Sequence, residues 1–154
     1  MMSDLLKVMP AETKDIAELY QLQLLAFESE AEMIGSRDVP ALMESEDSNR
    51  ADFANWIVLK MVNTDDKIVG AIRYKKMDDR IDVGRLMIHP DYRHRRLAQR
   101  LMDAVDEACP DMRKELYTCT KSWINIRLYE KMGYVATKEV TEDTGLSFVY
   151  MEKR

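Results

Sequence analysis

Residues 86–98 read LMIHPDYRHRRLA, and this stretch decides the fold. It begins with a short apolar strand that ends at Pro90, because proline cannot donate to the hydrogen-bond ladder of a central strand. A basic turn follows, and from Leu97 onward apolar residues recur at the three-to-four spacing of a helix. A strand, a tight basic turn and a helix in this order indicate an α/β protein.

The strand that leads into this stretch contains a phase shift. Its apolar residues stand first at odd positions, Ile81 and Val83. They then stand at even positions, Leu86 and Ile88. A β-bulge at Gly84-Arg85 would produce this shift, because two residues there would oppose one on the neighbouring strand. A fully buried run at the end of the strand would give the same pattern, so both interpretations stay open.

Alternating and helical patterns predict the remaining elements on either side of this stretch. The predicted strands are residues 5–9, 56–62, 68–76, 81–89, 115–119, 134–140 and 146–151. The predicted helices are residues 13–27, 97–108 and 122–132, and residues 28–55 read as short helical pieces and loops. This order predicts a single α/β (α+β) domain over residues 1–154, with a mixed central sheet of about seven strands and flanking helices.

The composition is that of a soluble globular protein, with 46% hydrophobic and 33% charged residues in a chain of 154. The longest apolar run, residues 56–62, is interrupted by Lys60 and is far shorter than the ~20 residues of a membrane helix, so no membrane partner is expected. The first residues lack the pattern of a signal peptide, so a cytoplasmic location is expected. Cys109 and Cys119 lack metal-ligand spacing, so no metal is expected.

Charge is distributed unevenly along the chain. Residues 1–50 carry eleven acids and four bases, a net charge of −7, within a total of −5. Four arginines fall within eight residues of one another, namely Arg93, Arg95, Arg96 and Arg100. An acidic chain without an aromatic and basic surface pattern argues against nucleic acid as a partner. The arginines therefore indicate either a site for one small anion or a solvated basic face.

The helix start at Leu97 favours the first of these interpretations. Unpaired N–H groups and the helix dipole attract a negative group there, and guanidinium groups bind phosphate in a forked geometry. The turn therefore suits a pyrophosphate. It is neither a three-glycine dinucleotide fingerprint nor a Walker loop, and an ordinary connection with surface arginines remains the alternative.

A second segment, residues 120–134, reads TKSWINIRLYEKMGY. With the first stretch, it resembles the Gcn5-related N-acetyltransferase (GNAT) superfamily. The loop of that family, Arg/Gln-x-x-Gly-x-Gly/Ala, is matched by RHRRLA at residues 93–98. Its helix ending Leu-Tyr-Glu-Lys-x-Gly-Phe/Tyr is matched by residues 128–134. The predicted order of elements agrees with the family over nearly the whole chain and is weakest over residues 28–55.

The resemblance implies an N-acetyltransferase with acetyl-CoA as donor, a small-molecule or peptide amine as acceptor, and no metal. The bulged fourth strand would splay from the fifth, and the pantetheine arm would lie in the gap. The amine would attack directly in a ternary complex, and Tyr129 would act as the general acid that protonates the departing thiolate. The residues implied for the cofactor are Met87, Ile88, Arg93, His94, Arg95, Arg96, Leu97, Ala98, Gln99 and Asn125. A homodimer is compatible with the resemblance.

Two positions depart from the family pattern. Arg96 stands where glycine is usual, and Ser122 stands where asparagine is common. A helical backbone at Arg96 would accommodate a side chain, whereas another conformation would oppose cofactor binding. The second outcome would favour a catalytically inactive CoA-binding sensor or regulatory relative, which is the alternative function.

The sequence does not single out a general base. Asp82 is expected on the face of its strand opposite Ile81. Glu28, Glu30 and Glu32 belong either to the acceptor site or to a solvated acidic face. The family resemblance implies that the first helix and the following segment form the wall of the acceptor cleft. The net charge of −7 in residues 1–50 then predicts a small cationic amine or the amino end of a peptide as acceptor, because a negative wall attracts a protonated amine.

Overall fold

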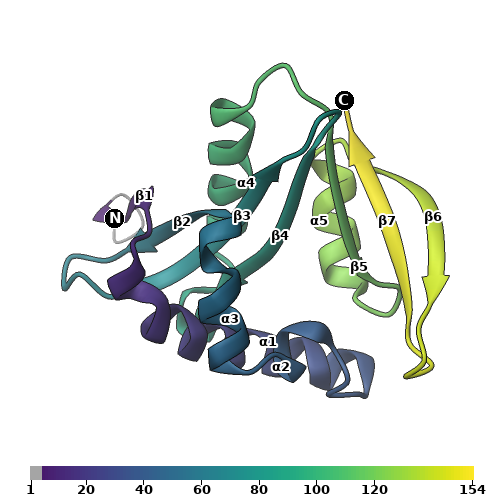
Figure 1. Ribbon diagram of the computed structural model, residues 1–154, viewed down its shortest axis with the longest axis horizontal. Coiled ribbons are helices and arrows are strands. Elements are labelled where there is room, and N and C mark those ends of the chain that lie inside the picture. The colour runs from purple at the N-terminus through teal and green to yellow at the C-terminus, as the bar shows by residue number, and fades with distance from the viewer. Residues whose placement is uncertain (1–4) are drawn as a thin grey trace.

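The computed structural model describes residues 5–154, which form one mixed sheet with helices on both faces (Figure 1). The strands are β1 (Lys7–Pro10), β2 (Ile57–Val62), β3 (Ile68–Lys76), β4 (Ile81–Ile88), β5 (Lys114–Cys119), β6 (Val135–Thr141) and β7 (Ser147–Lys153). The helices are α1 (Ile16–Ile34), α2 (Pro40–Met43), α3 (Glu46–Asp52), α4 (Leu97–Ala108) and α5 (Trp123–Lys131). Short 3-10 turns are Thr13–Asp15, Phe53–Asn55 and Pro90–Tyr92.

The seven strands follow the order β1-β2-β3-β4-β5-β7-β6. All neighbouring pairs are antiparallel except β4 and β5, which are parallel. The predicted mixed α/β fold with its seven-stranded sheet is therefore confirmed. One face of the sheet packs against α1, and the other packs against α4 and α5.

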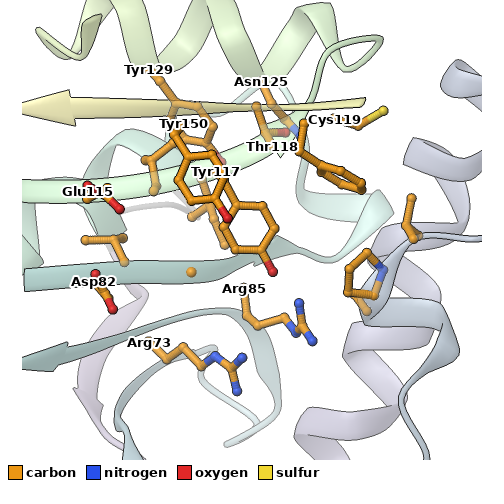
Figure 2. Close-up of a pocket in the computed structure, with 18 of the residues that line it drawn as sticks. Arg73, Asp82, Arg85, Glu115, Tyr117, Thr118, Cys119, Asn125, Tyr129 and Tyr150 are labelled. Atoms are coloured by element: carbon orange, nitrogen blue, oxygen red, sulfur yellow. The ribbon is translucent and has the colours of Figure 1, made fainter. Parts of the chain in front are cut away.

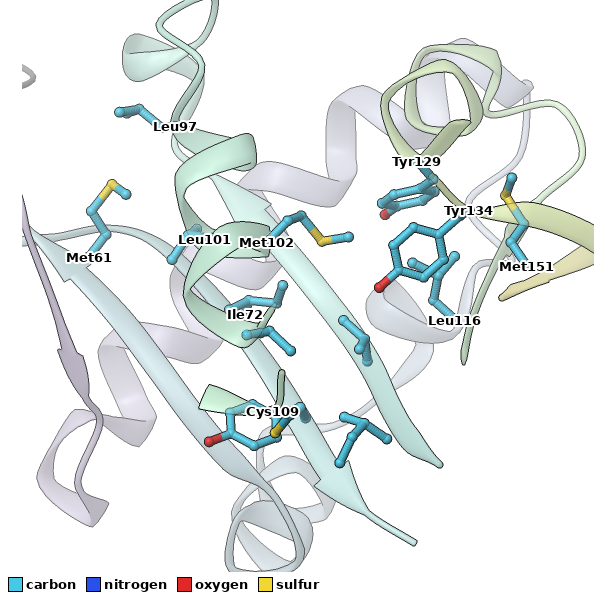
Figure 3. Close-up of a cluster of buried hydrophobic side chains, with 14 of the residues drawn as sticks. Met61, Ile72, Leu97, Leu101, Met102, Cys109, Leu116, Tyr129, Tyr134 and Met151 are labelled. Atoms are coloured by element: carbon cyan, nitrogen blue, oxygen red, sulfur yellow. The ribbon is translucent and has the colours of Figure 1, made fainter. Parts of the chain in front are cut away.

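The larger core lies on the α4 face (Figure 3). Leu97, Leu101 and Met102 project from α4 onto the sheet, and Leu101 is fully buried. Tyr129 of α5 and the following Tyr134 belong to the same cluster. Burial of this apolar surface fixes the position of α4, and with it the basic turn that precedes the helix.

The bulge predicted at Gly84-Arg85 is confirmed. Ala71 of β3 pairs with Met87 of β4, and Arg73 pairs with Gly84, so β4 advances three residues while β3 advances two. The extra residue is Arg85, whose φ of 48° is left-handed. As the phase shift predicted, the apolar residues on both sides of the bulge pack into the same core cluster, namely Ile81, Val83, Leu86 and Ile88.

The bulge is followed by a separation of β4 from β5. The two strands pair only at Ile81 with Lys114 and at Asp82 with Glu115. From Val83 to Ile88, β4 is hydrogen-bonded along the sheet to β3 alone. Figure 1 shows β4 and β5 diverging from their paired ends.

The helix expected over residues 13–27 is longer than the sequence indicated. It runs from Ile16 to Ile34 and ends at Gly35, whose φ of 76° supports the left-handed C-cap. Its last two turns bury Ala31 and Ile34, so the apolar periodicity continues through the segment that reads as acidic. The expected short pieces are found after it as α2 and α3. The first predicted strand, residues 5–9, is displaced by one or two residues to Lys7–Pro10.

Candidate active site

A cavity of about 380 Å³ lies where β4 and β5 diverge (Figure 2). Arg85 and Tyr117 line it from the α1 face, and Met102 and Tyr129 line it from the α4 face. The cavity therefore passes through the sheet, and molecules that approach from opposite faces can meet inside it.

Tyr129, the expected general acid, lies at this cavity. Its side chain is only 8% exposed and its ring lies 6.1 Å from the ring of Tyr134. Burial, together with the nearby Glu30 carboxylate, raises the pKa of the Tyr129 phenol above its ordinary value. The phenol therefore stays protonated at neutral pH, as a proton donor requires.

Glu30 projects from α1 into the same cavity. The Ser122 hydroxyl donates to Glu30 Oε1 at 2.5 Å. Burial raises the pKa of the Glu30 carboxyl, although the Ser122 hydrogen bond and the charge of Arg85 oppose the shift. A carboxylate in this environment is a better proton acceptor than an exposed one.

The three acids near the end of α1, Glu28, Glu30 and Glu32, have different environments. Glu28 pairs with Arg37 on the surface, and Glu32 is exposed. Only Glu30 faces the cavity, because it continues the buried helix face of Gln23 and Ile34 at helical spacing. That spacing is the signal that could have identified Glu30 in the sequence.

The structure gives a reason for serine, in place of the family's asparagine, at position 122. It is fully buried at the start of α5 and makes no side-chain cap, because its hydroxyl is directed to Glu30. Asn125, expected at the cofactor, lies one turn further along α5 and lines the cavity.

The other expected cofactor residues lie outside the cavity lining. Met87 packs with α1, whereas Ile88 packs on the α4 face. Both belong to the part of β4 that has no pairing with β5. The remainder of the set stands in the basic turn and at the start of α4, namely Arg93, His94, Arg95, Arg96, Leu97, Ala98 and Gln99.

Two side chains of the basic turn, Arg93 and Arg95, contact the rest of the protein. Arg93 donates to Ser29 Oγ at 2.7 Å and to the Ala26 carbonyl at 3.1 Å, which attaches the turn to α1. The guanidinium of Arg95 lies 5.1 Å from the centre of the Tyr92 ring. The turn therefore presents its backbone and the exposed side chains of residues 94–96 to solvent.

The backbone at Arg96 is not right-handed helical. Its φ of 59° and ψ of 25° are left-handed, and His94 has a φ of 65°. Arg96 therefore keeps the conformation that glycine adopts most easily, at a cost of about 1–2 kcal/mol for a residue with a Cβ. The turn retains the shape that leads into an uncapped helix start, which favours an anion.

Two arginines that the sequence did not assign to the site lie on the α1 face of the cavity (Figure 2). Arg73 and Arg85 have side chains only 15% and 17% exposed. Burial and the neighbouring Arg85 lower the pKa of Arg73 to about 10. Arg73 therefore remains charged at neutral pH.

Asp82 and Arg80 line another part of the cavity and are paired with each other. Arg80 Nε donates to Asp82 Oδ1 at 2.7 Å, so the Asp82 carboxylate is already engaged. Among residues 5–154, no cluster of histidine, cysteine or acidic side chains could hold a metal ion. No helix in the same range is long and apolar enough to cross a membrane.

The chain is similar to a protein family and to a curated protein. The model of the acetyltransferase (GNAT) domain family matches residues 43–154. UPF0157 protein YqkA of Bacillus subtilis is 26% identical over 130 residues, which are 84% of this chain and 37% of that protein. The chain thus spans little more than a third of the length of this curated relative.

Solved structures agree with the fold. A GNAT-family acetyltransferase from Staphylococcus aureus superposes with a TM-score of 0.77 at 15% identity, covering 96% of this chain and 98% of that one. The PaiA N-acetyltransferase of Thermoplasma acidophilum, in complex with coenzyme A, has a TM-score of 0.74 at 16% identity, covering 97% and 98%.

Proposed function

Because the chain belongs to the GNAT acetyltransferase family, we propose that it transfers an acetyl group from acetyl-CoA to a primary amine by direct attack. The observation that carries this proposal is the cavity through the sheet, which holds a protonated phenol and a half-buried carboxylate at one site. Such a pair can remove a proton from the amine and return one to the leaving group.

The residues around the opening fit acetyl-CoA, which supplies an activated thioester when bound. The backbone of Met87 and Ile88 belongs to a strand edge with no partner on β5, so it can hold an extended amide chain like an added strand. Residues 93–99 would hold the pyrophosphate at the start of α4. Asn125 would contact the donor from α5.

Glu30 and Tyr129 divide the proton transfers between them. Glu30 accepts the proton that the acceptor ammonium must lose before its nitrogen lone pair attacks the carbonyl carbon. Backbone N–H groups at the unpaired edge of β4 polarise that carbonyl. As the carbon–nitrogen bond forms and the carbon–sulfur bond breaks, Tyr129 gives its proton to the departing sulfur. The second proton, which the nitrogen loses as it becomes an amide, returns to the Tyr129 oxygen. The acceptor is a small molecule or the amino end of a peptide.

Tyr129→Phe tests the proposal directly. The substitution keeps the buried ring and removes the proton donor, so kcat should fall about 10²–10⁴-fold with little change in the Kd of acetyl-CoA. Thiol release over an amine panel and calorimetry with acetyl-CoA give the two quantities.

Tyr134→Phe is the matched control. Tyr134 is buried beside Tyr129, but it does not line the cavity, so its variant should keep kcat. Normal turnover in Tyr129→Phe would contradict the assignment of the acid. Tight binding of acetyl-CoA without transfer to any amine would instead support the CoA-binding sensor.

A further inference from the structure

We propose that the acceptor is an amine that also carries a carboxylate, as an amino acid does, and that Arg73 and Arg85 bind this carboxylate. The inference rests on the proposed function and specifies its substrate class. It differs from the cationic acceptor that the net charge of residues 1–50 predicted.

The two arginines come together through the bulge. Arg73 of β3 pairs with Gly84, and the extra residue Arg85 follows immediately on the same α1 face. In Figure 2 both guanidinium groups lie on one side of the cavity, and Tyr117 and Tyr150 lie on the other. Two like charges are therefore held close together in a partly buried site, which is costly without an anion.

The acids beside the arginines are already shared with neutral donors. Asp52 Oδ2 lies 3.5 Å from Arg73 Nη1, but it accepts from Trp56 Nε1 at 2.9 Å. Charge-assisted hydrogen bonds between a guanidinium and a carboxylate are about 2.7–2.9 Å long, so the contact to Arg73 is a loose one.

Glu44 stands in the same relation to Arg85. Its Oε1 lies 3.6 Å from Arg85 Nη2, whereas it accepts from Gln23 Nε2 at 2.9 Å and from Asn49 Nδ2 at 3.0 Å. Glu44 and Asp52 therefore keep the arginines in place without saturating them.

The Nε atoms of Arg73 and Arg85 are buried and have no hydrogen-bond partner among residues 5–154. A buried donor without a partner is unfavourable, so the arrangement is incomplete in the absence of a ligand. Arg80 provides the contrast. It lines the same cavity, yet its Nε is bonded to Asp82 at 2.7 Å. A carboxylate matches the forked geometry of a guanidinium and would bind the Nη groups, whose contacts to Asp52 and Glu44 are loose.

The rest of the cavity suits the remainder of an amino acid. Tyr117 and Tyr150 stack with ring centres 5.4 Å apart, and Trp56 lies 4.0 Å beneath the Arg73 guanidinium. The two tyrosine rings offer apolar surface to a side chain, whereas the Trp56 ring is covered by Arg73 and Lys75. Glu30 lines the same cavity and is the proposed acceptor of the amine proton.

Many of the acids that give residues 1–50 a net charge of −7 do not face this cavity. They form ion pairs on the surface, as Glu28 does with Arg37, Glu46 with Arg50 and Glu12 with Lys14. Their field is therefore partly cancelled and screened by solvent, whereas Arg73 and Arg85 act at short range inside the cavity.

The test uses matched acceptors on one carbon skeleton. For each of several side chains, thiol release is measured with the amino acid, its amide, its decarboxylated amine and its phosphonate analogue. We expect the amino acid to exceed the amide and the amine by about 10–100-fold in kcat/KM, the size expected for charged hydrogen bonds. Arg73→Met and Arg85→Met should abolish this preference, Arg85→Lys should restore part of it, and the control Arg80→Met should keep it.

A binding measurement makes the test independent of turnover. In a Trp123→Phe background, Trp56 is the one tryptophan left and reports on the cavity through its contact with Arg73. With CoA present, the amino acid should change its fluorescence saturably and the amide should not.

The outcomes separate the two proposals. Equal use or equal binding of amino acid and amide overturns the carboxylate assignment, and acetylation of the plain amine then leaves the acetyltransferase intact. A preference for the phosphonate over the carboxylate also overturns it. Absence of transfer to every acceptor overturns the proposed function, and the fluorescence titration still decides whether the arginines bind a carboxylate.

Discussion

The molecule holds two groups of arginines, and they differ in almost every respect. Arg93, Arg95 and Arg96 are close together in the sequence, and the last two are exposed. Arg73 and Arg85 are twelve residues apart and lie on two strands, where their side chains are largely buried. The first group is conspicuous in the sequence and engages neighbouring side chains and solvent. The second is inconspicuous and is left with unsatisfied donors.

The difference shows that the density of charge in a sequence and the strength of a binding site are separate properties. An exposed guanidinium acts through water and is screened by salt. A buried one acts through a lower effective dielectric, so each contact that it makes with a ligand is stronger. The exposed group therefore suits a donor that must bind and leave, and the buried pair suits discrimination between acceptors.

The largest effect on kcat is expected at Glu30, which is the proposed proton acceptor and belongs to neither group of arginines. Glu30→Gln should lower kcat by about 10²–10⁴-fold, because the amine loses its proton acceptor. In the parent protein, kcat/KM should rise with pH through a pKa above the ordinary value of a glutamate, since the carboxyl must be ionised to act. The variant should lose this acidic limb of the pH–rate profile.

The stability of Glu30→Gln separates a catalytic role from a structural one. Because folding raises the pKa of Glu30, ionisation lowers stability as the pH rises above the ordinary pKa of a glutamate, and the loss is complete above the raised pKa of the folded state. The neutral glutamine avoids this cost and can still accept from Ser122. Its melting temperature at pH 7 should therefore equal or exceed that of the parent, and a large fall would contradict the catalytic interpretation.

Smaller effects, on the binding of substrates, should distinguish the exposed arginines of the basic turn from the buried pair Arg73 and Arg85. Arg95→Glu should raise the Kd of acetyl-CoA about 10-fold at low salt, and the effect should shrink as salt is added. The KM of the acceptor should not change. Arg85→Met should give the opposite pattern, with an effect on the acceptor that is insensitive to salt. If both variants changed the same substrate constant, the distinction between the two groups would be lost.

Arg93→Gln completes this comparison with the anchor of the turn. Arg93 attaches the turn to α1 through Ser29 and the Ala26 carbonyl. Calorimetry should show weaker acetyl-CoA binding together with a lower melting temperature, whereas Arg95→Glu should leave the melting temperature unchanged.

The smallest effect is expected at Arg96. Glycine removes the cost of about 1–2 kcal/mol of a left-handed backbone, and it adds about 0.5–1 kcal/mol of conformational entropy to the unfolded chain. Arg96→Gly should therefore raise the free energy of unfolding by at most about 1.5 kcal/mol, measured by urea denaturation. A loss of stability would indicate that the Arg96 side chain makes favourable contacts of its own.

Much of the fold could be predicted because its signals are local. The shift in apolar spacing between Val83 and Leu86 indicated the bulge, and the apolar spacing after Leu97 indicated α4. The predicted helix ended at residue 27, before α1 ends, because the acids at residues 28–32 obscured the apolar spacing that Ala31 and Ile34 continue.

The site was less accessible to sequence reasoning. Tyr129 and Asn125 were identified through a motif, and both line the cavity. The Arg73–Arg85 pair depends on strand register and bulge geometry together, which no short window of sequence contains. Glu30 required the true length of α1 before its neighbours on one helix face could be recognised.

The short pairing between β4 and β5 divides the single sheet into two halves that are joined at one end. β1–β4 and β5–β7 share the register of two residue pairs, reinforced there by the Ile81 N–H to the Arg113 carbonyl at 2.8 Å. The Arg113–Glu152 ion pair, with 2.6 Å between Nη1 and Oε2, lies at the same end. Beyond it, the two halves are linked by side chains, since Ile34 packs in one cluster with Cys119 and Phe148 and Ser122 is hydrogen-bonded to Glu30. The width of the opening is therefore set by side-chain packing and not by the backbone ladder, and a molecule that bridges the open end would add contacts between the two halves of the sheet.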